Sequence, residues 1–204
     1  LNNAVIEPGS HGSGAEWSAG AWFDNIVAAQ AATISAATFT FTAQTTYDAG
    51  ASVVKYYVSA QLVVDAGTFA DSLGNRLTVA DRVRTIATVA WTQTSIVADT
   101  EYTVDITAVI QEIVNQMTWA SGNAIVILVD THEDCTQGEW QTYYSYDGST
   151  TKAPKLAVTV AAALAALAAR LLHRLVVQAT RELSMLVLLA VQARMHKAAA
   201  VIEA

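Results

Sequence analysis

The chain has little cysteine, proline or charge. Its 204 residues include one cysteine, Cys135, so no disulfide can form within the chain. Prolines occur at Pro8 and Pro154 alone, and charged residues make up 14% of the chain, against about 25% in an average soluble protein. Stability must therefore come from apolar burial, and the length suits one ordinary domain with an appendage.

Positive charge is scarce in the first three-quarters of the chain. Residues 1–160 hold 6 Lys and Arg against 16 Asp and Glu, whereas residues 161–204 hold 5 against 2. An acidic body repels phosphate backbones, so no nucleic-acid partner is expected. No run of about 18 uncharged apolar residues occurs, and residues 183–193 are too short, so the sequence predicts no membrane span.

Catalytic motifs are also missing. Within residues 1–160 the histidines are His11 and His132, and neither sits in a recognisable nucleophile motif. No phosphate loop or dinucleotide fingerprint is present. A carboxylate pair for glycoside hydrolysis stays open, because Asp and Glu are plentiful and nothing distinguishes two of them. The sequence favours a protein that is not an enzyme and uses no cofactor.

A period of two dominates residues 36–159. Phe39 and Phe41 alternate with threonines, and similar alternation follows Val54, Val89 and Tyr102. This pattern predicts antiparallel strands with one wet face. Residues 21–160 are therefore expected to form a mainly β, jelly-roll-like antiparallel β-sandwich.

Two segments depart from that alternation. Residues 105–117 have helical spacing, which predicts one short helix with Asp105 or Thr107 as its cap. Residues 124–129 are apolar on both faces, which predicts a central, fully covered strand. Residues 1–20 are rich in Gly, Ser and Asn and are interpreted as a flexible arm.

Residues 161–204 contain no glycine, proline or aromatic residue and are dominated by Ala and Leu. They predict a long C-terminal α-helix, or a helical hairpin if the helix breaks near Thr180. A helix with an apolar stripe needs a neighbour to cover it. The segment is therefore interpreted as an assembly element whose contact residues are Leu164, Leu167, Leu171, Leu175, Leu183 and Leu186.

Several motifs taken in order resemble a known family. They are Ile110-Gln111-Glu112-Ile113-Val114-Asn115, Trp119-Ala120-Ser121-Gly122-Asn123-Ala124, Tyr144-Ser145-Tyr146-Asp147-Gly148-Ser149 and Ala153-Pro154-Lys155-Leu156. Over residues 20–160 the chain resembles DNRLRE-type (disaggregatase-related) β-sandwich domains. The resemblance implies a jelly-roll-like sandwich akin to carbohydrate-binding modules, of the kind found on surface, secreted and phage structural proteins. It brings no catalytic residues, and the C-terminal helix departs from the family pattern.

An aromatic strand is one candidate ligand site. Its members are Trp140, Tyr143, Tyr144 and Tyr146. Aromatic faces stack on sugar rings, so an exposed row would bind a glycan. Alternation places Trp140, Tyr144 and Tyr146 on one face and Tyr143 on the other. We favour the interpretation that the three-residue face belongs to the core.

An acidic loop is the second candidate. Asp130, Glu133 and Asp134, with Glu139 nearby, supply oxygen ligands of the type that Ca²⁺ prefers, although the spacing is not that of an EF-hand. The alternative is a solvated acidic loop at one end of the sandwich.

The sequence favours a structural or display protein of a larger particle, specifically a phage virion accessory protein of the head, neck or tail. Its partners would be copies of itself and other particle proteins, and its location the virion or a cell surface. The alternative is a carbohydrate-binding or adhesin module of a bacterial surface or secreted protein.

Overall fold

The computed structural model describes residues 5–12, 15–48, 50–69, 82–161 and 164–202. Within the last of these segments, side chains are described for residues 171–192. The chain divides into two compact units, Leu1–Ala161 and Ala162–Ala204. Each unit is considered by itself below.

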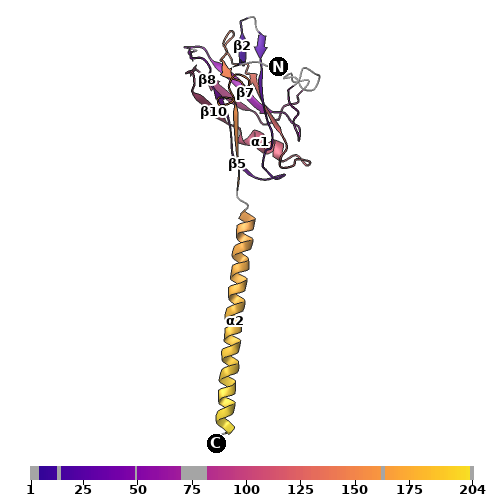
Figure 1. Ribbon diagram of the computed structural model, residues 1–204, viewed down its shortest axis with the longest axis vertical. Coiled ribbons are helices and arrows are strands. Elements are labelled where there is room, and N and C mark those ends of the chain that lie inside the picture. Colours follow the sequence, from indigo (N-terminus) through magenta and orange to yellow (C-terminus); the bar gives the residue numbers. More distant parts are fainter. Residues whose placement is uncertain (1–4, 13–14, 49, 70–81, 162–163, 203–204) are drawn as a thin grey trace. The chain divides into compact units, whose positions relative to one another are not determined.

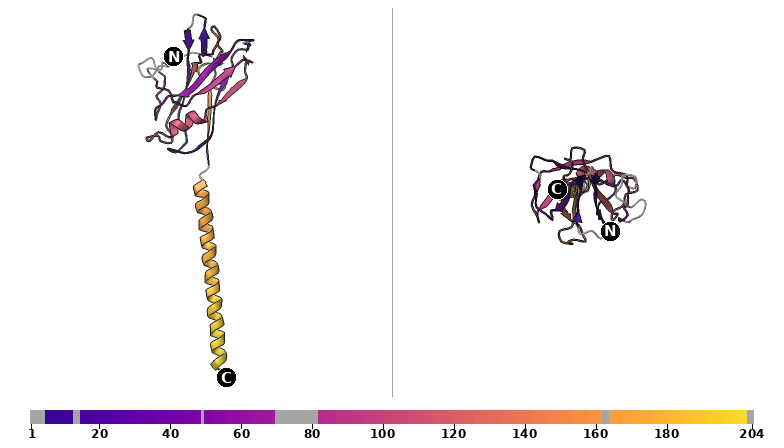
Figure 2. Two further views of the ribbon diagram at one scale, coloured as in Figure 1. Left: turned by 180° about the vertical axis from the view of Figure 1, so that it is seen from behind. Right: turned by 90° about the horizontal axis from the view of Figure 1, so that it is seen from above.

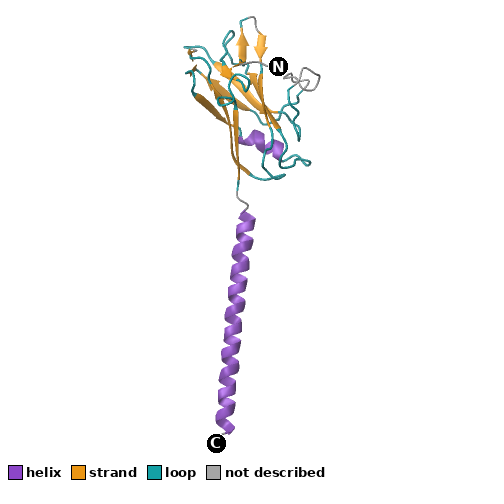
Figure 3. Ribbon diagram, in the orientation of Figure 1, coloured by secondary structure: helices purple, strands orange, loops and turns teal. Residues whose placement is uncertain are grey.

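The first unit is built on two antiparallel sheets (Figures 1 and 3). The larger sheet has the order β4 (Ala19–Phe23), β11 (Ile125–Thr131), β7 (Val54–Ala60) and β8 (Val89–Gln93). The smaller sheet has the order β10 (Glu101–Asp105), β5 (Ile34–Thr42) and β13 (Lys155–Val160). The mainly β, antiparallel fold predicted from the alternation is confirmed.

One hydrophobic core joins the inner faces of the two sheets, which makes the unit a sandwich (Figure 2). Phe39 and Phe41 of β5 are fully buried and pack edge to face at a centroid distance of 4.7 Å. Ile125 and Ile127 of β11 belong to the same core, while Val126 on the opposite face joins a second small cluster. The prediction of a central strand covered on both faces is therefore confirmed.

Three short two-stranded ladders complete the unit. They are β1 (Val5–Ile6) with β12 (Tyr143–Tyr144), β2 (Gly9–His11) with β3 (Ala15–Trp17), and β6 (Tyr47–Asp48) with β9 (Ser95–Ile96). The flexible arm predicted for residues 1–20 is therefore wrong for residues 5–12 and 15–20, most of which lie in strands β1 to β4. Gly9 serves close packing, because it has φ +136° and abuts the backbone of Glu139.

The predicted short helix is α1 (Thr107–Val114). Its N-cap is Ile106, which has no side-chain cap hydrogen bond, so neither Asp105 nor Thr107 is the N-cap residue. The Thr107 hydroxyl instead accepts a hydrogen bond from the Ala37 backbone at 2.9 Å, and Asp105 accepts from the Thr107 backbone at 2.8 Å. Both side chains therefore fix the entry of the helix beside β5.

Three motif residues after β10 hold neighbouring loops. Gln111 accepts from the Ile34 backbone at 2.8 Å and donates to the Ala32 carbonyl at 2.9 Å. Glu112 accepts from two consecutive backbone N–H groups, and Trp119 donates to the Ala28 carbonyl at 2.9 Å. These motif residues therefore act in the fold, because they satisfy backbone groups at the start of β5 and in the loops before β5 and β8.

The second unit is the single helix α2 (Leu164–Ile202), 39 residues long. No break occurs at Thr180, so the hairpin alternative is wrong. The Thr180 hydroxyl donates to the carbonyls of Val176 and Val177 at 3.0 and 2.8 Å. Threonine in mid-helix commonly satisfies its hydroxyl in this way without ending the helix.

Candidate functional site

The described side chains of α2 form an exposed apolar surface. Within residues 171–192 the large aliphatic side chains are between 49% and 67% exposed, apart from partly buried Val177. The predicted contact residues Leu171, Leu175, Leu183 and Leu186 are among them, while the side chains of Leu164 and Leu167 lie outside the described residues. An exposed apolar surface of this extent marks a site of contact with another molecule or a membrane.

One stripe on this helix has the spacing of a coiled-coil seam. Its members are separated alternately by four and three residues, and all six are exposed: Leu172, Val176, Ala179, Leu183, Leu186 and Ala190. This spacing keeps one apolar seam facing a partner helix. Arg174 and Arg181 lie roughly on the opposite side of the helix, as the 3.6-residue period requires. These six residues form the α2 stripe.

The segment Leu171–Gln192 also meets the length and composition of a membrane span, with a mean hydropathy of 1.4 and none of it buried. This match rests on length and composition alone, so the expectation of no membrane span stays a prediction. Three charged residues lie in the segment, Arg174, Arg181 and Glu182, and the last two stand near its middle.

A long groove runs along one side of the sandwich, between the edge strands β4 and β13. Its volume is about 1540 Å³. All five residues of β4 line it, together with Ile6, Leu156 and Val158 on the inner side and Phe69. Trp22 and Tyr146 also line the groove, and their side chains are 37% and 68% exposed.

The favoured interpretation places the Trp140 face of the aromatic strand in the core, but the structure buries the Tyr143 face instead. Tyr143 is fully buried and stacks on Phe41 at a centroid distance of 4.7 Å. Trp140 and Tyr146 are exposed, and Tyr144 is partly buried. The assignment of the Trp140 face to the core is therefore wrong. Burial raises the pKa of the Tyr143 phenol, which donates to Gln141 Oε1 at 2.5 Å.

The exposed aromatic residues do not form one row. His11 stacks between Trp17 and Trp140, with centroid distances of 3.6 and 4.3 Å, so one face of Trp140 is covered. Of the four residues proposed for glycan binding, Tyr146 alone lines the groove. The groove itself, with Trp22 at its edge, was missed because its residues come from segments far apart in the sequence.

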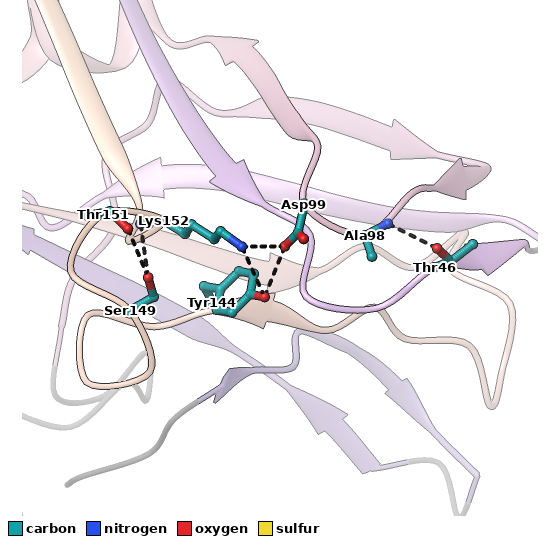
Figure 4. Close-up of polar contacts among 7 residues, drawn as sticks. All are labelled: Thr46, Ala98, Asp99, Tyr144, Ser149, Thr151 and Lys152. Carbon is teal, nitrogen blue, oxygen red and sulfur yellow. Dashed lines mark hydrogen bonds and ion pairs between the residues drawn. The ribbon is translucent and has the colours of Figure 1, made fainter.

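Tyr144 belongs to a polar cluster on the surface (Figure 4). Its hydroxyl donates to Asp99 at 3.0 Å, and Lys152 lies over its ring at 4.8 Å while binding the same carboxylate at 2.6 Å. The Lys152 ammonium and the Tyr144 hydroxyl hold the pKa of Asp99 below its usual range. Asp99 in turn raises the pKa of Lys152.

The carboxylates proposed for calcium each contact another group. Asp130 binds the guanidinium of Arg84 through both oxygens, at 2.8 and 3.0 Å. Asp134 binds Lys55 at 2.7 Å, which lowers the pKa of that carboxyl. Glu133 accepts from the Tyr57 hydroxyl at 2.7 Å, and its pKa is also lowered.

In the part of the chain that the structure describes, no group of three or more His, Cys, Asp or Glu residues converges as metal ligands do. A calcium ion at this loop would have to compete with Arg84 and Lys55 for the carboxylates. The calcium site stays a hypothesis, and the geometry gives it no support.

No protein-family model matches this chain, and no curated protein is significantly similar to it. The resemblance to DNRLRE-type domains therefore stays a hypothesis that rests on the ordered motifs alone. The mainly β fold is compatible with it.

Proposed function

We propose that this chain is a non-enzymatic structural protein that displays its β-sandwich on a larger particle, with α2 as the assembly element. The observation that carries the proposal is the exposure of the aliphatic side chains of α2 over Leu171–Gln192. Each Leu or Val moved from water to a buried interface contributes about 1.5–3 kcal/mol. A helix of this composition is therefore stabilised by covering its apolar surface.

Two properties favour other helices over lipid as the cover. The first is the α2 stripe, whose alternating spacing is that of helix–helix seams. The second is charge: an arginine at the centre of a bilayer costs about 2.5–3.5 kcal/mol, whereas each Leu or Val gains about 0.3–0.6 kcal/mol. Arg181 thus offsets about six such residues, and Glu182 adds a second charge to the same turn.

Copies of the same chain are the simplest partners, because identical helices present matching stripes in a symmetric assembly. A phage virion accessory protein of the head, neck or tail is the specific role that we propose. Virion proteins repeat in many copies, and a helix that assembles with its own copies suits such repetition. The acidic sandwich would remain on the outside, where its negative charge keeps it soluble.

The proposal is tested by light scattering on the full chain and on a chain ending at Val160. We expect the full chain to contain more copies per particle than the shortened chain at equal concentration. A full chain that runs as a 21.6 kDa monomer in the tens of micromolar range would contradict the proposal.

A carbohydrate-binding or adhesin module is the second candidate. It is favoured by Trp22 and Tyr146, which line an open groove with exposed rings. Glu7 and Asp147 line the same groove and offer hydrogen-bond acceptors for sugar hydroxyls. A glycan array probed with the full chain tests this function. It predicts binding that is lost in Tyr146→Ala and kept in Tyr57→Ala, which removes a tyrosine that does not line the groove.

A further inference from the structure

Strand β4 ends the larger sheet without the features that normally protect an edge. It pairs with β11 on one side, and in the described part of the chain no strand pairs with its other side. Its sequence, Ala-Gly-Ala-Trp-Phe, contains no charge and no proline. Edge strands in soluble proteins usually carry such residues, because free backbone groups otherwise recruit another strand.

Strand β13, across the groove, is also an edge strand, and it carries features that prevent pairing with another strand. It begins with Lys155 directly after Pro154, and its register shifts between Thr159 and Val160. A charge, a proline and an irregular register each discourage pairing. The edge of β4 has none of these, although it borders the groove of about 1540 Å³ from end to end.

The sequence of β4 is complementary to itself when two copies run antiparallel. Pairing centred on Ala21 places Gly20 of one copy opposite Trp22 of the other, on the outer face of the sheet. Gly20 is partly buried and Trp22 is 37% exposed. Because Trp22 Nε1 donates to the Ala66 carbonyl at 2.7 Å, this register places the exposed part of a held indole opposite a residue without a side chain. An aromatic residue opposite an edge glycine is a favourable cross-strand arrangement, because the ring covers the glycine backbone.

The same register also places core-face residues of one copy opposite core-face residues of the other. Ala19 of one copy meets Phe23 of the other, and both side chains belong to the core face. A strand pairing shifted by one residue would place core residues on the wet face. Beyond the strand, Asp24 meets Ser18 of the second copy, and Glu16 meets Ile26, so no two carboxylates stand directly opposite each other.

We propose that β4 pairs with β4 of a second copy of this chain, antiparallel and about a two-fold axis at Ala21. The two larger sheets then form one continuous sheet of eight strands. A second copy is the partner because the register that joins the two edges also matches small residue with large and core face with core face. This interface is separate from the α2 stripe, so it goes beyond the proposed function.

Two independent interfaces make a sharp experiment possible on the full chain. The helix variant carries Leu183→Glu and Leu186→Glu, which place charges in the α2 stripe and remove helix association. Analytical ultracentrifugation of the helix variant at about 50 µM is expected to show a dimer of 21.6 kDa chains. Adding Gly20→Lys to the helix variant is expected to give a monomer, because a charge on the outer face opposes edge pairing.

The matched control is Val27→Lys in the helix variant. Val27 is 74% exposed and lines the same groove but lies beyond the end of β4. We expect this variant to remain a dimer. Trp22→Ala tests the register itself and is expected to weaken the dimer by about tenfold, since two Trp–Gly pairs are lost by symmetry.

Hydrogen exchange provides a readout that does not depend on a substitution. Exchange of the β4 amides in the helix variant should slow as protein concentration rises, while that of the exposed α1–β11 turn should not change. A monomeric helix variant, or a dimer whose mass is unchanged by Gly20→Lys, overturns the proposal for β4. A wild-type mass that the helix substitutions leave unchanged contradicts the function proposed for α2 instead.

Discussion

Gly9 lies directly against Trp140, so that a Cβ atom on Gly9 would come within 2.7 Å of the Trp140 Cα. Contacts that close do not occur between real atoms, and the backbone of Gly9 has φ +136°, which side chains disfavour. The N-terminal segment is therefore part of the folded unit. Its glycine is required by packing, although glycine in a sequence more often indicates a loop.

Gly9→Ala should destabilise the first unit by about 1–3 kcal/mol through overpacking, and by more because of the positive φ. Gly12→Ala is the matched control, because no atom lies within 4 Å of a Cβ at that position. Urea denaturation followed by tryptophan fluorescence measures both. Equal free energies of unfolding for the two variants would mean that the segment around Gly9 does not pack against Trp140 in solution.

Alanine substitutions on the two faces of the aromatic strand are expected to differ in their effect on stability. Tyr143→Ala should cost about 3–5 kcal/mol, because it removes a fully buried ring that packs on Phe41. Tyr146→Ala, at a side chain that is 68% exposed, should change stability by less than about 0.5 kcal/mol. Thermal unfolding of the two variants decides which face is the core. A larger loss in Tyr146→Ala would restore the original interpretation.

The alternation identified the strands but could not orient this one. β12 has two residues, and its facing is determined by pairing with β1, where Val5 lies opposite Tyr144 and Ile6 opposite Tyr143. Those partners are almost 140 positions away in the chain. The inner faces of β5 and β11 were predictable, because their long alternating or continuous apolar stretches define a buried face locally.

The groove and the edge of β4 were beyond prediction for a related reason. An edge strand is recognised by the absence of a neighbour, which depends on the order of strands in the sheet. The apolar helix was predictable from composition, because residues 161–204 contain no helix breaker. Its continuity through Thr180 was not, since the hydroxyl can bond either outward or back to the helix.

Acid should destabilise the first unit as carboxylates with lowered pKa values become protonated. Asp99 and Asp134 both have pKa values lowered mainly by hydrogen bonds from lysine, from Lys152 and Lys55 respectively. The unfolded chain binds protons to these groups first, so their contribution is present above the ordinary aspartate pKa of about 3.8. It is lost as the pH falls through their lower folded values.

Asp99→Asn removes one of these groups and should make stability fall less steeply as the pH drops below about 4. Asp147→Asn serves as the comparison at an exposed carboxylate in the turn after β12. Urea midpoints measured at several pH values give the slope. An unchanged slope in Asp99→Asn would show that the contact with Lys152 does not hold in solution.

Calcium should not raise the thermal midpoint of the full chain at about 1 mM, because Asp130 is already bound by Arg84 and Asp134 by Lys55. Differential scanning fluorimetry with CaCl₂, and with MgCl₂ as the control, measures the effect. A calcium-specific rise in the midpoint that Asp130→Asn abolishes would establish the ion site proposed from the acidic loop.

Self-association through the α2 stripe is tested most directly by sedimentation equilibrium on three full-length chains. They are the wild type, the helix variant with Leu183→Glu and Leu186→Glu, and a control with Met185→Glu and Leu188→Glu. The control places the same two charges on the other side of the helix, at side chains that are each 65% exposed. We expect the helix variant to form an assembly with fewer copies, and therefore a lower mass, than the wild type. The control is expected to keep the wild-type mass. A wild-type chain that sediments at 21.6 kDa, or equal masses for all three, would contradict assembly through this helix.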